Sequence, residues 1–152
     1  MKRFSFPLHP VSVLRAHREL LAQEAFAASV NAFVKSQETL AATRARVARF
    51  EASLFAGRRV TFNPAAEAQA LAAYRQECAV EIETERAMFA AKEAMAKCRA
   101  AYLEAHRSVE VLNRLEANAR LEHRLETSRE EQAEFDDVAT RRAMKPQTLF
   151  KS

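Results

Sequence analysis

Glycine and proline are almost absent from most of this sequence, and their absence limits the folds open to it more than any other feature. The chain has one glycine, Gly57, and neither residue type occurs between Ala65 and Lys145. An average domain of this length would carry about ten glycines. Because sharp turns depend on these residue types, the segment from Gly57 to Pro64 is the best place for the backbone to reverse. The sequence therefore predicts two long helices joined by one bend.

The composition favours an elongated pair of helices over a deep globular core. Hydrophobic residues make up 49% of the 152-residue chain, but alanine supplies much of that share, and there are two tyrosines and no tryptophan. Alanine promotes helix formation yet buries little area, so it suits narrow contacts between helices. The length indicates one domain.

Local start and stop signals set the expected boundaries. Pro10 suits the first turn of a helix, and Gly57 suits its C-cap. Asn63 followed by Pro64 is a start signal, with Asn63 as the N-cap and Pro64 in the first helical position. We predict an all-α fold, a two-helix antiparallel coiled-coil hairpin forming a single domain over 1–152, with an extended lead-in over 1–10, helix one over 11–56, a turn over 57–63, a longer helix two over 64–144 and a tail over 145–152.

Apolar residues recur every seven positions in both predicted helices, which is typical of a left-handed coiled coil. In helix one, two adjacent rows would form a broad apolar stripe. These rows are Phe26, Phe33, Leu40, Val47 and Leu54, and Val13, Leu20, Ala27, Val34, Ala41, Ala48 and Phe55. Helix two has Tyr74, Met88, Met95, Tyr102 and Val109, and beside them Ile82, Phe89, Ala96 and Leu103.

The second predicted helix is longer than the first and should extend past it. If the bend centres near residue 60, the numbers of facing residues add up to about 120, and helix two overshoots by about 30 residues. A lone helix with a thin apolar stripe gains little stability from packing. We therefore expect a partner to cover this overhang, with fraying as the alternative.

Charge is distributed unevenly along the chain. Residues 1–20 carry +3 and residues 141–152 carry +4, so the remainder of this +4 chain carries −3. The basic ends of a hairpin would meet an acidic partner or a membrane surface, or would be solvated tails. Cys78 and Cys98 would lie about 30 Å apart on one helix, too far for a disulfide. With neither a signal peptide nor a membrane span, we expect a cytoplasmic protein.

No catalytic, cofactor or metal site is predicted, and we expect no enzyme activity. The histidines show no i, i+4 pairing with one another, and a single glycine cannot build a phosphate-binding loop. We expect all four at the helix surface: His9, His17, His106 and His123. Nucleic-acid binding is disfavoured because glutamates interleave with the arginines of the overhang.

Both ends of the sequence resemble the flagellar FliJ family. The first end is Met1-Lys2-Arg3-Phe4-Ser5-Phe6-Pro7-Leu8, followed by Val13-Leu14-Arg15 and by Glu19 and Glu24-Ala25. The other end is Glu131-Gln132-Ala133-Glu134-Phe135-Asp136-Asp137-Val138-Ala139-Thr140-Arg141-Arg142-Ala143-Met144-Lys145-Pro146. The family's layout of a short head, a first helix, a brief turn and a longer second helix is similar along the whole chain.

The resemblance implies a soluble, cytoplasmic component of the flagellar type III export apparatus, built like the stalk subunit of rotary ATP synthases. The partners it implies are the hexameric export ATPase, the cytoplasmic domain of the export gate and export chaperones, with only peripheral membrane association. For the ATPase-binding end our hypothesis is Val13, Leu14, Arg15, Phe135, Asp136, Asp137, Val138, Arg141 and Arg142. For the gate we name Tyr74, an aromatic match, and Phe50, from exposure arguments. A generic coiled-coil adaptor and an injectisome stalk protein are the alternatives.

Overall fold

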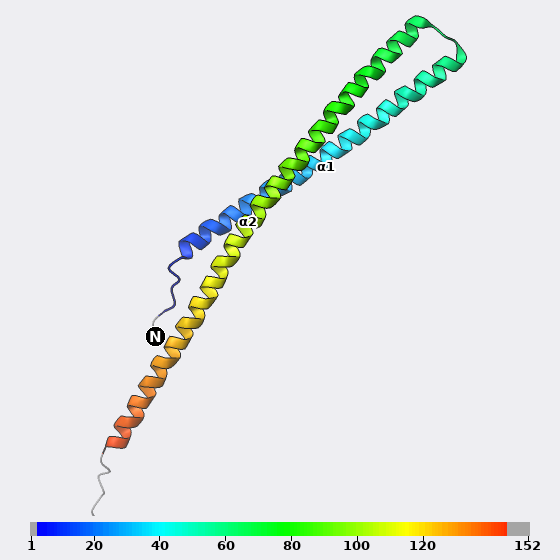
Figure 1. The fold of residues 1–152 in the computed structure, drawn as a ribbon. Helices are drawn as coiled ribbons and strands as arrows, with labels where there is room; N and C mark the ends of the chain where they lie inside the picture. Colours follow the sequence, from blue (N-terminus) through cyan, green and yellow to red (C-terminus); the bar gives the residue numbers. More distant parts are fainter. Residues whose placement is uncertain (1–2, 146–152) are drawn as a thin grey trace, which may run out of the picture. The chain divides into compact units, whose positions relative to one another are not determined.

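The computed structural model of the chain describes residues 3–145, which contain two helices and no strand (Figure 1). Helix α1 spans His9–Val60 and helix α2 spans Pro64–Met144. The bounds of α2 are those predicted, whereas α1 begins two residues earlier and ends four residues later than predicted. Of the predicted tail, only Lys145 is described, and residues 146–152 lie outside the described residues.

The chain divides into two compact units, which we describe separately. The turn unit is His17–His106, and the terminal unit combines Met1–Ala16 with Arg107–Ser152. The two long helices pack against each other, as predicted for an all-α helical hairpin. That the whole chain forms one domain, and that the helices supercoil, stay predictions.

Gly57 lies inside α1 and does not cap it. The helix continues to Val60, and Gly57 does not have a positive φ. The predicted C-cap is therefore wrong, because a capping glycine of that kind takes the left-handed conformation. The helix ends at Val60 instead, and Pro64 disfavours helical geometry at Asn63, the residue that precedes it.

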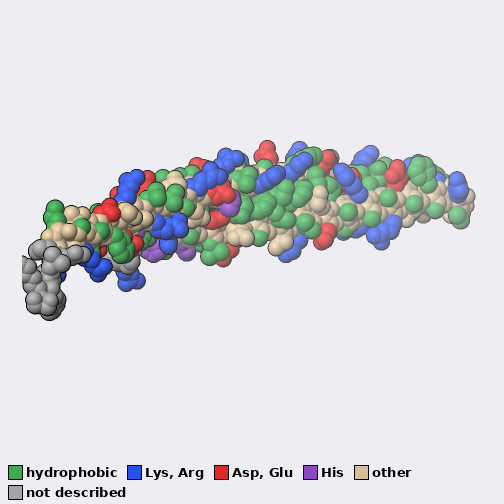
Figure 2. Space-filling view, turned by 90° about the horizontal axis from the view of Figure 1, so that it is seen from below, with side chains coloured by type: hydrophobic (Ala, Val, Ile, Leu, Met, Phe, Trp, Pro, Cys, Tyr) green, Lys and Arg blue, Asp and Glu red, His purple; other side chains and the backbone are tan. Residues whose placement is uncertain are grey.

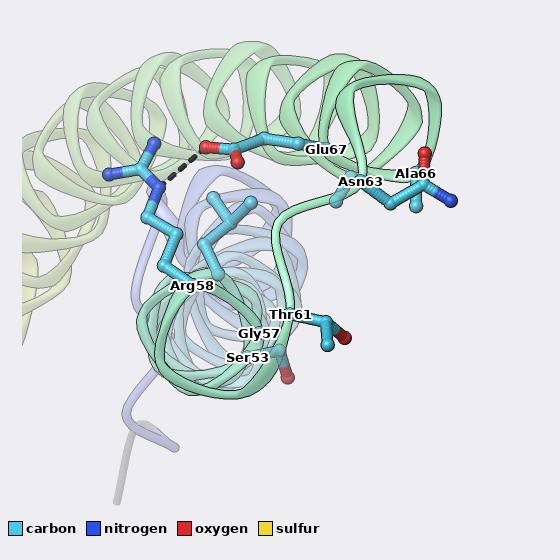
Figure 3. A pocket seen from close by; sticks show the side chains of 9 residues that line it. Ser53, Gly57, Arg58, Thr61, Asn63, Ala66 and Glu67 are labelled. Atoms are coloured by element: carbon cyan, nitrogen blue, oxygen red, sulfur yellow. Dashed lines mark hydrogen bonds and ion pairs between the residues drawn. The ribbon is translucent and has the colours of Figure 1, made fainter.

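Helix α2 begins as the sequence predicts. The Asn63 side-chain oxygen accepts a hydrogen bond from the backbone N–H of Ala65 (3.1 Å), and its carbonyl accepts one from Glu67 (3.0 Å). Asn63 is thus the N-cap, and Pro64 occupies the first position, where no N–H is required. Arg58 of α1 donates to Glu67 across the turn (Figure 3), and this pair closes one side of a hollow of about 180 Å³ that Gly57 also lines.

The helices of the turn unit pair in reverse order, so they run in opposite directions. Ion pairs join Arg58 to Glu67 and Arg44 to Glu81, and His106 contacts Glu19 at the other end of the unit. The residue numbers of each pair add up to 125. The predicted sum of about 120 is therefore too low, because the bend lies at 61–63 and not near residue 60.

One of the two apolar rows predicted for α1 is buried and the other is not. Leu40 and Val47 are buried, and Phe26, Phe33 and Leu54 are half-buried. The second row is exposed throughout: Val13, Leu20, Ala27, Val34, Ala41, Ala48 and Phe55. The prediction of a broad stripe is wrong. The line of contact between the two helices, which we call the seam, follows the alternating three- and four-residue spacing of a two-helix contact. This spacing selects the position three residues after each residue of the buried row and not the position directly after it.

Small and hydroxyl-bearing side chains complete the α1 seam, at positions three residues after those of the buried row. Ala22, Ser29 and Ser36 are half-buried there, and Thr43 is fully buried. The hydroxyl of Ser29 donates to the Phe26 carbonyl (2.6 Å), and that of Thr43 donates to the Thr39 carbonyl (2.9 Å). Because these hydroxyls bond within their own helix, they can be buried without loss of hydrogen bonds.

Helix α2 shows the same division. Its first predicted row is half-buried: Tyr74, Met88, Met95, Tyr102 and Val109. Its second predicted row, Ile82, Phe89, Ala96 and Leu103, is exposed. The residues that complete the seam again lie three positions on and include Ala91, Cys98, Ala105 and the buried Leu112. Both helices therefore carry an apolar row outside the seam.

Candidate protein-binding surfaces

The described residues offer large apolar side chains at the surface, and Figure 2 shows hydrophobic side chains reaching the surface on one face. Among residues 3–145, no group of three or more His, Cys, Asp or Glu side chains could hold a metal ion. Cys78 and Cys98 are free thiols. Neither described helix contains a segment that is apolar and long enough to cross a membrane.

The last turns of α2 carry the C-terminal part of the predicted ATPase-binding residues. Phe135 is 71% exposed and Val138 is 45% exposed. With Arg142 they follow i, i+3, i+7 spacing, so the three side chains share one face of the helix. The remaining residues of the group are also exposed: Asp136, Asp137 and Arg141. The group therefore combines apolar and charged side chains on one accessible helix end.

The start of α1 carries the other part of that prediction, and the structure does not bring the two parts together. Val13 and Leu14 are exposed, whereas Arg15 is half-buried and donates from Nη1 to the backbone carbonyl of Ser108 (3.3 Å). Phe135 lies 27 residues farther along α2 than Ser108, which corresponds to about 40 Å at the helical rise per residue. The nine residues therefore form two separate surfaces.

Phe50 and Tyr74, the predicted gate-binding residues, both occupy seam positions. Each is half-buried, and their numbers add up to 124, which places them at the same level of the turn unit. The exposure argument for Phe50 is therefore not supported. A hydrogen bond with the Cys78 side chain is the main cause that raises the pKa of Tyr74 above its ordinary value of 10, and the charge on Glu51 acts in the same direction.

The terminal unit contains an aromatic cluster that the sequence reasoning missed. The Phe4 ring meets the His123 ring edge-on, with 5.5 Å between centroids, and the Arg120 guanidinium lies 5.1 Å from the Phe4 centroid. Arg120 also pairs with Glu116 at 2.8 Å. The lead-in therefore covers part of α2 that was predicted to be overhang. The alternation of Phe4, Phe6 and Leu8 was the available signal, since one side of an extended segment can then pack on a helix.

Two of the four histidines contact a neighbouring segment and are half-buried. His106 Nδ1 lies 2.7 Å from Glu19 Oε1, and its ring stacks on Tyr102 with 6.0 Å between centroids. His123 contacts Phe4 as described above. His9 and His17 are exposed as predicted, whereas His106 and His123 lie at the surface but are partly covered by these contacts, which the prediction did not include.

Two long packed helices with apolar side chains outside their seam define a protein of the helical-hairpin class. The sequence matches the family described as "Flagellar FliJ protein" over residues 4–148, and the chain belongs to this family. Membership makes it a component of the flagellar type III protein export apparatus. No curated protein and no solved structure shows significant similarity to the chain.

Proposed function

We propose that the protein is a stalk-like coupler of flagellar export. It binds the hexameric export ATPase, promotes assembly and activity of the ATPase ring, and links the ring to the export gate and to export chaperones. It acts in the cytoplasm and reaches the membrane only through the export apparatus. Family membership supports the export role over a generic coiled-coil adaptor and an injectisome protein.

The observation that carries the ATPase contact is the exposure of Phe135, the most exposed phenylalanine of the described chain. Large aromatic side chains supply much of the binding energy when a partner covers them, and a helix face with i, i+3, i+7 anchors is a common recognition element. Val138 and Arg142 complete this face. Arg141 and Arg142 add positive charge, which suits an acidic partner surface and also the negative end of the helix dipole.

A matched pair of phenylalanine variants tests this contact. Phe135→Ala should weaken binding to the cognate export ATPase by about tenfold or more and reduce its stimulation. Phe62→Ala is the control, because Phe62 is 69% exposed but lies at the turn. Equal stimulation by both variants, with helicity unchanged by circular dichroism, would contradict the assignment.

The charges and the second surface need separate tests because the two surfaces lie far apart. Reversing Arg141 and Arg142 to glutamate should weaken stimulation and make the remaining binding less sensitive to salt. Replacing Val13 and Leu14 by serine should weaken binding independently of Phe135 if both surfaces meet the ATPase. Additive losses in the combined variant support two contacts; full binding by the Val13 and Leu14 variant removes the first-helix surface.

The gate contact is the second part of the proposal and rests on Phe50 and Tyr74. Tyr74→Ala should reduce capture of the gate's cytoplasmic domain, and Tyr74→Phe, which keeps the ring in the seam, should retain it. Full capture by a folded Tyr74→Ala variant would remove Tyr74 from the proposal. Phe50→Leu, which keeps an apolar side chain in the seam, tests in the same way whether the aromatic ring itself is needed.

A further inference from the structure

The turn unit has an apolar surface that the seam does not use. On α1, Leu20 and Val34 are 51% and 42% exposed, although each follows a seam residue directly. On α2, Ile82, Phe89 and Leu103 are 52%, 51% and 39% exposed. Isolated exposed apolar residues are normal at protein surfaces, but a regular row on each of two packed helices needs an explanation.

The two rows lie on the same side of the seam. Arg44 lies four residues after the seam residue Leu40 and pairs with Glu85, which lies four residues after the seam residue Glu81. On both helices, therefore, the residues four positions after a seam residue lie on the same side of the seam. A residue four positions after a seam residue is rotated about 40° from it around the helix axis. A residue of the exposed rows, one position after a seam residue, is rotated about 100° in the same sense, so both rows project toward this side.

The rows are also in register with each other. The numbers of Leu20 and Leu103 add up to 123, and so do those of Val34 and Phe89, which is the sum for the observed ion pair of Arg46 and Glu77. Ala27 with Ala96 and Ala41 with Ile82 give the same sum. We define the outer apolar face as these eight residues: Leu20, Ala27, Val34, Ala41, Ile82, Phe89, Ala96 and Leu103.

The charges beside this face differ between the helices. Glu24 and Glu38 lie one turn after Leu20 and Val34, and neither has an ion pair among the described residues. No other charged residue of α1 lies on this side between Leu20 and Ala41. The half of the outer apolar face that α1 contributes is therefore flanked by acidic residues. The α2 half is mainly basic once Glu85 is paired with Arg44, and its other charged residues are Arg86, Lys92, Glu93 and Arg99.

An acidic half beside a basic half is complementary to a rotated copy of itself. A two-fold axis parallel to the helices places α1 of one copy over α2 of the other at an unchanged level. Leu20 then meets Leu103 of the partner subunit, and Val34 meets Phe89 of the partner subunit. Glu38 and Arg86 also meet at this level, because their numbers add up to 124. Within residues 3–145, Arg86 forms an ion pair only with Glu83, and both side chains of this pair are more than 70% exposed. Such a pair is weak.

We propose that the outer apolar face is a dimerisation surface whose occupant is a second copy of this chain, with α1 of each copy packed on α2 of the other. Both the matched apolar levels and the opposite charges of the two halves support this occupant. The proposal concerns the free protein and does not depend on the contacts with the ATPase or the gate.

Sedimentation equilibrium of the full chain from about 1 to about 200 µM tests the proposal, since weak specific dimers dissociate within this range. The wild-type chain should pass from monomer to dimer. Leu20→Glu should raise the dissociation constant at least about tenfold, because each dimer carries the change twice. Leu21→Glu is the matched control: Leu21 is 50% exposed but turns to the other side of α1, and the dissociation constant should not change.

A charge exchange tests the arrangement of the two copies. Arg86→Glu should weaken the dimer, and adding Glu38→Arg in the same chain should restore it, since each contact joins the two copies. A wild-type chain that stays monomeric throughout, or equal effects of the Leu20 and Leu21 variants in helical proteins, would overturn the dimer. A double variant no tighter than Arg86→Glu alone would overturn the placement of α1 on α2.

Discussion

Replacing Gly57 by alanine distinguishes two descriptions of how α1 ends. If Gly57 were a left-handed C-cap, alanine would destabilise the fold by about 1 kcal/mol. In the structure Gly57 lies within α1 without a positive φ, and a methyl group added to it would meet nothing within 4 Å. The substitution should therefore stabilise the protein, because alanine has the higher helix propensity and restricts the unfolded chain.

The expected gain is at the lower end of the range for helix interiors. Glycine inside a helix costs about 0.5–1 kcal/mol relative to alanine. Because Gly57 lies in the last turn of α1, which ends at Val60, we expect about 0.5 kcal/mol and a rise in the melting temperature of about 1–2 °C. Urea and thermal unfolding followed by far-ultraviolet circular dichroism measure both quantities.

Ala56 provides the matched control, since it is the preceding exposed residue of the same helix. Ala56→Gly should lower the midpoint of urea unfolding by about as much as Gly57→Ala raises it. A lower midpoint for Gly57→Ala would refute the reasoning, because it would require a backbone conformation at residue 57 that alanine cannot adopt without strain.

Three further predictions concern single side chains. Asn63→Ala should lower the free energy of unfolding by about 1 kcal/mol, because the N–H groups at the start of α2 lose their cap; urea unfolding measures this, and Asn63→Asp should retain the stability. Thr43→Val keeps the shape of a fully buried side chain but removes its hydrogen bonds, so it should cost about 1 kcal/mol, and no loss would show that the hydroxyl is dispensable. In a Tyr102→Phe background, phenolate absorbance should show that the pKa of Tyr74 lies above 10, and Cys78→Ala should lower that pKa because it removes the main cause of the shift. Since the unfolded chain loses the Tyr74 proton at a lower pH than the folded chain, the stability that Tyr74 contributes should fall as the pH rises above 10.

Local signals in the sequence predicted the parts of the fold that depend on local chemistry. The Asn63–Pro64 start of α2 follows from a side chain that accepts a backbone N–H and a ring that lacks one, and both are visible in the sequence. The row from Phe26 to Leu54 follows from its seven-residue spacing. Gly57 was misplaced because glycine alone does not show whether its φ is positive.

The small residues that complete the α1 seam, and the alignment of α1 with α2, depend on contacts between the two helices. The sequence alone therefore did not predict them. Ala22, Ser29 and Ser36 carry little apolar surface, and the more hydrophobic neighbours such as Leu20 and Val34 drew the prediction to the wrong side. Phe4 belongs to the same group of failures, because its position on α2 is a contact between residues more than a hundred positions apart. The candidate binding residues stay predictions, and their division into two separate surfaces was not predicted.

The reverse-order pairing of the turn unit has a consequence for folding kinetics. The contact between Arg58 and Glu67 closes a loop of nine positions, that between Arg44 and Glu81 one of 37, and that between Glu19 and His106 one of 87. Since loop-closure entropy rises with length, pairing should begin at the turn and proceed outward like a zipper. The contacts at Glu19 and His106 then form last and open first, so amide exchange within this unit should be fastest at its end opposite the turn.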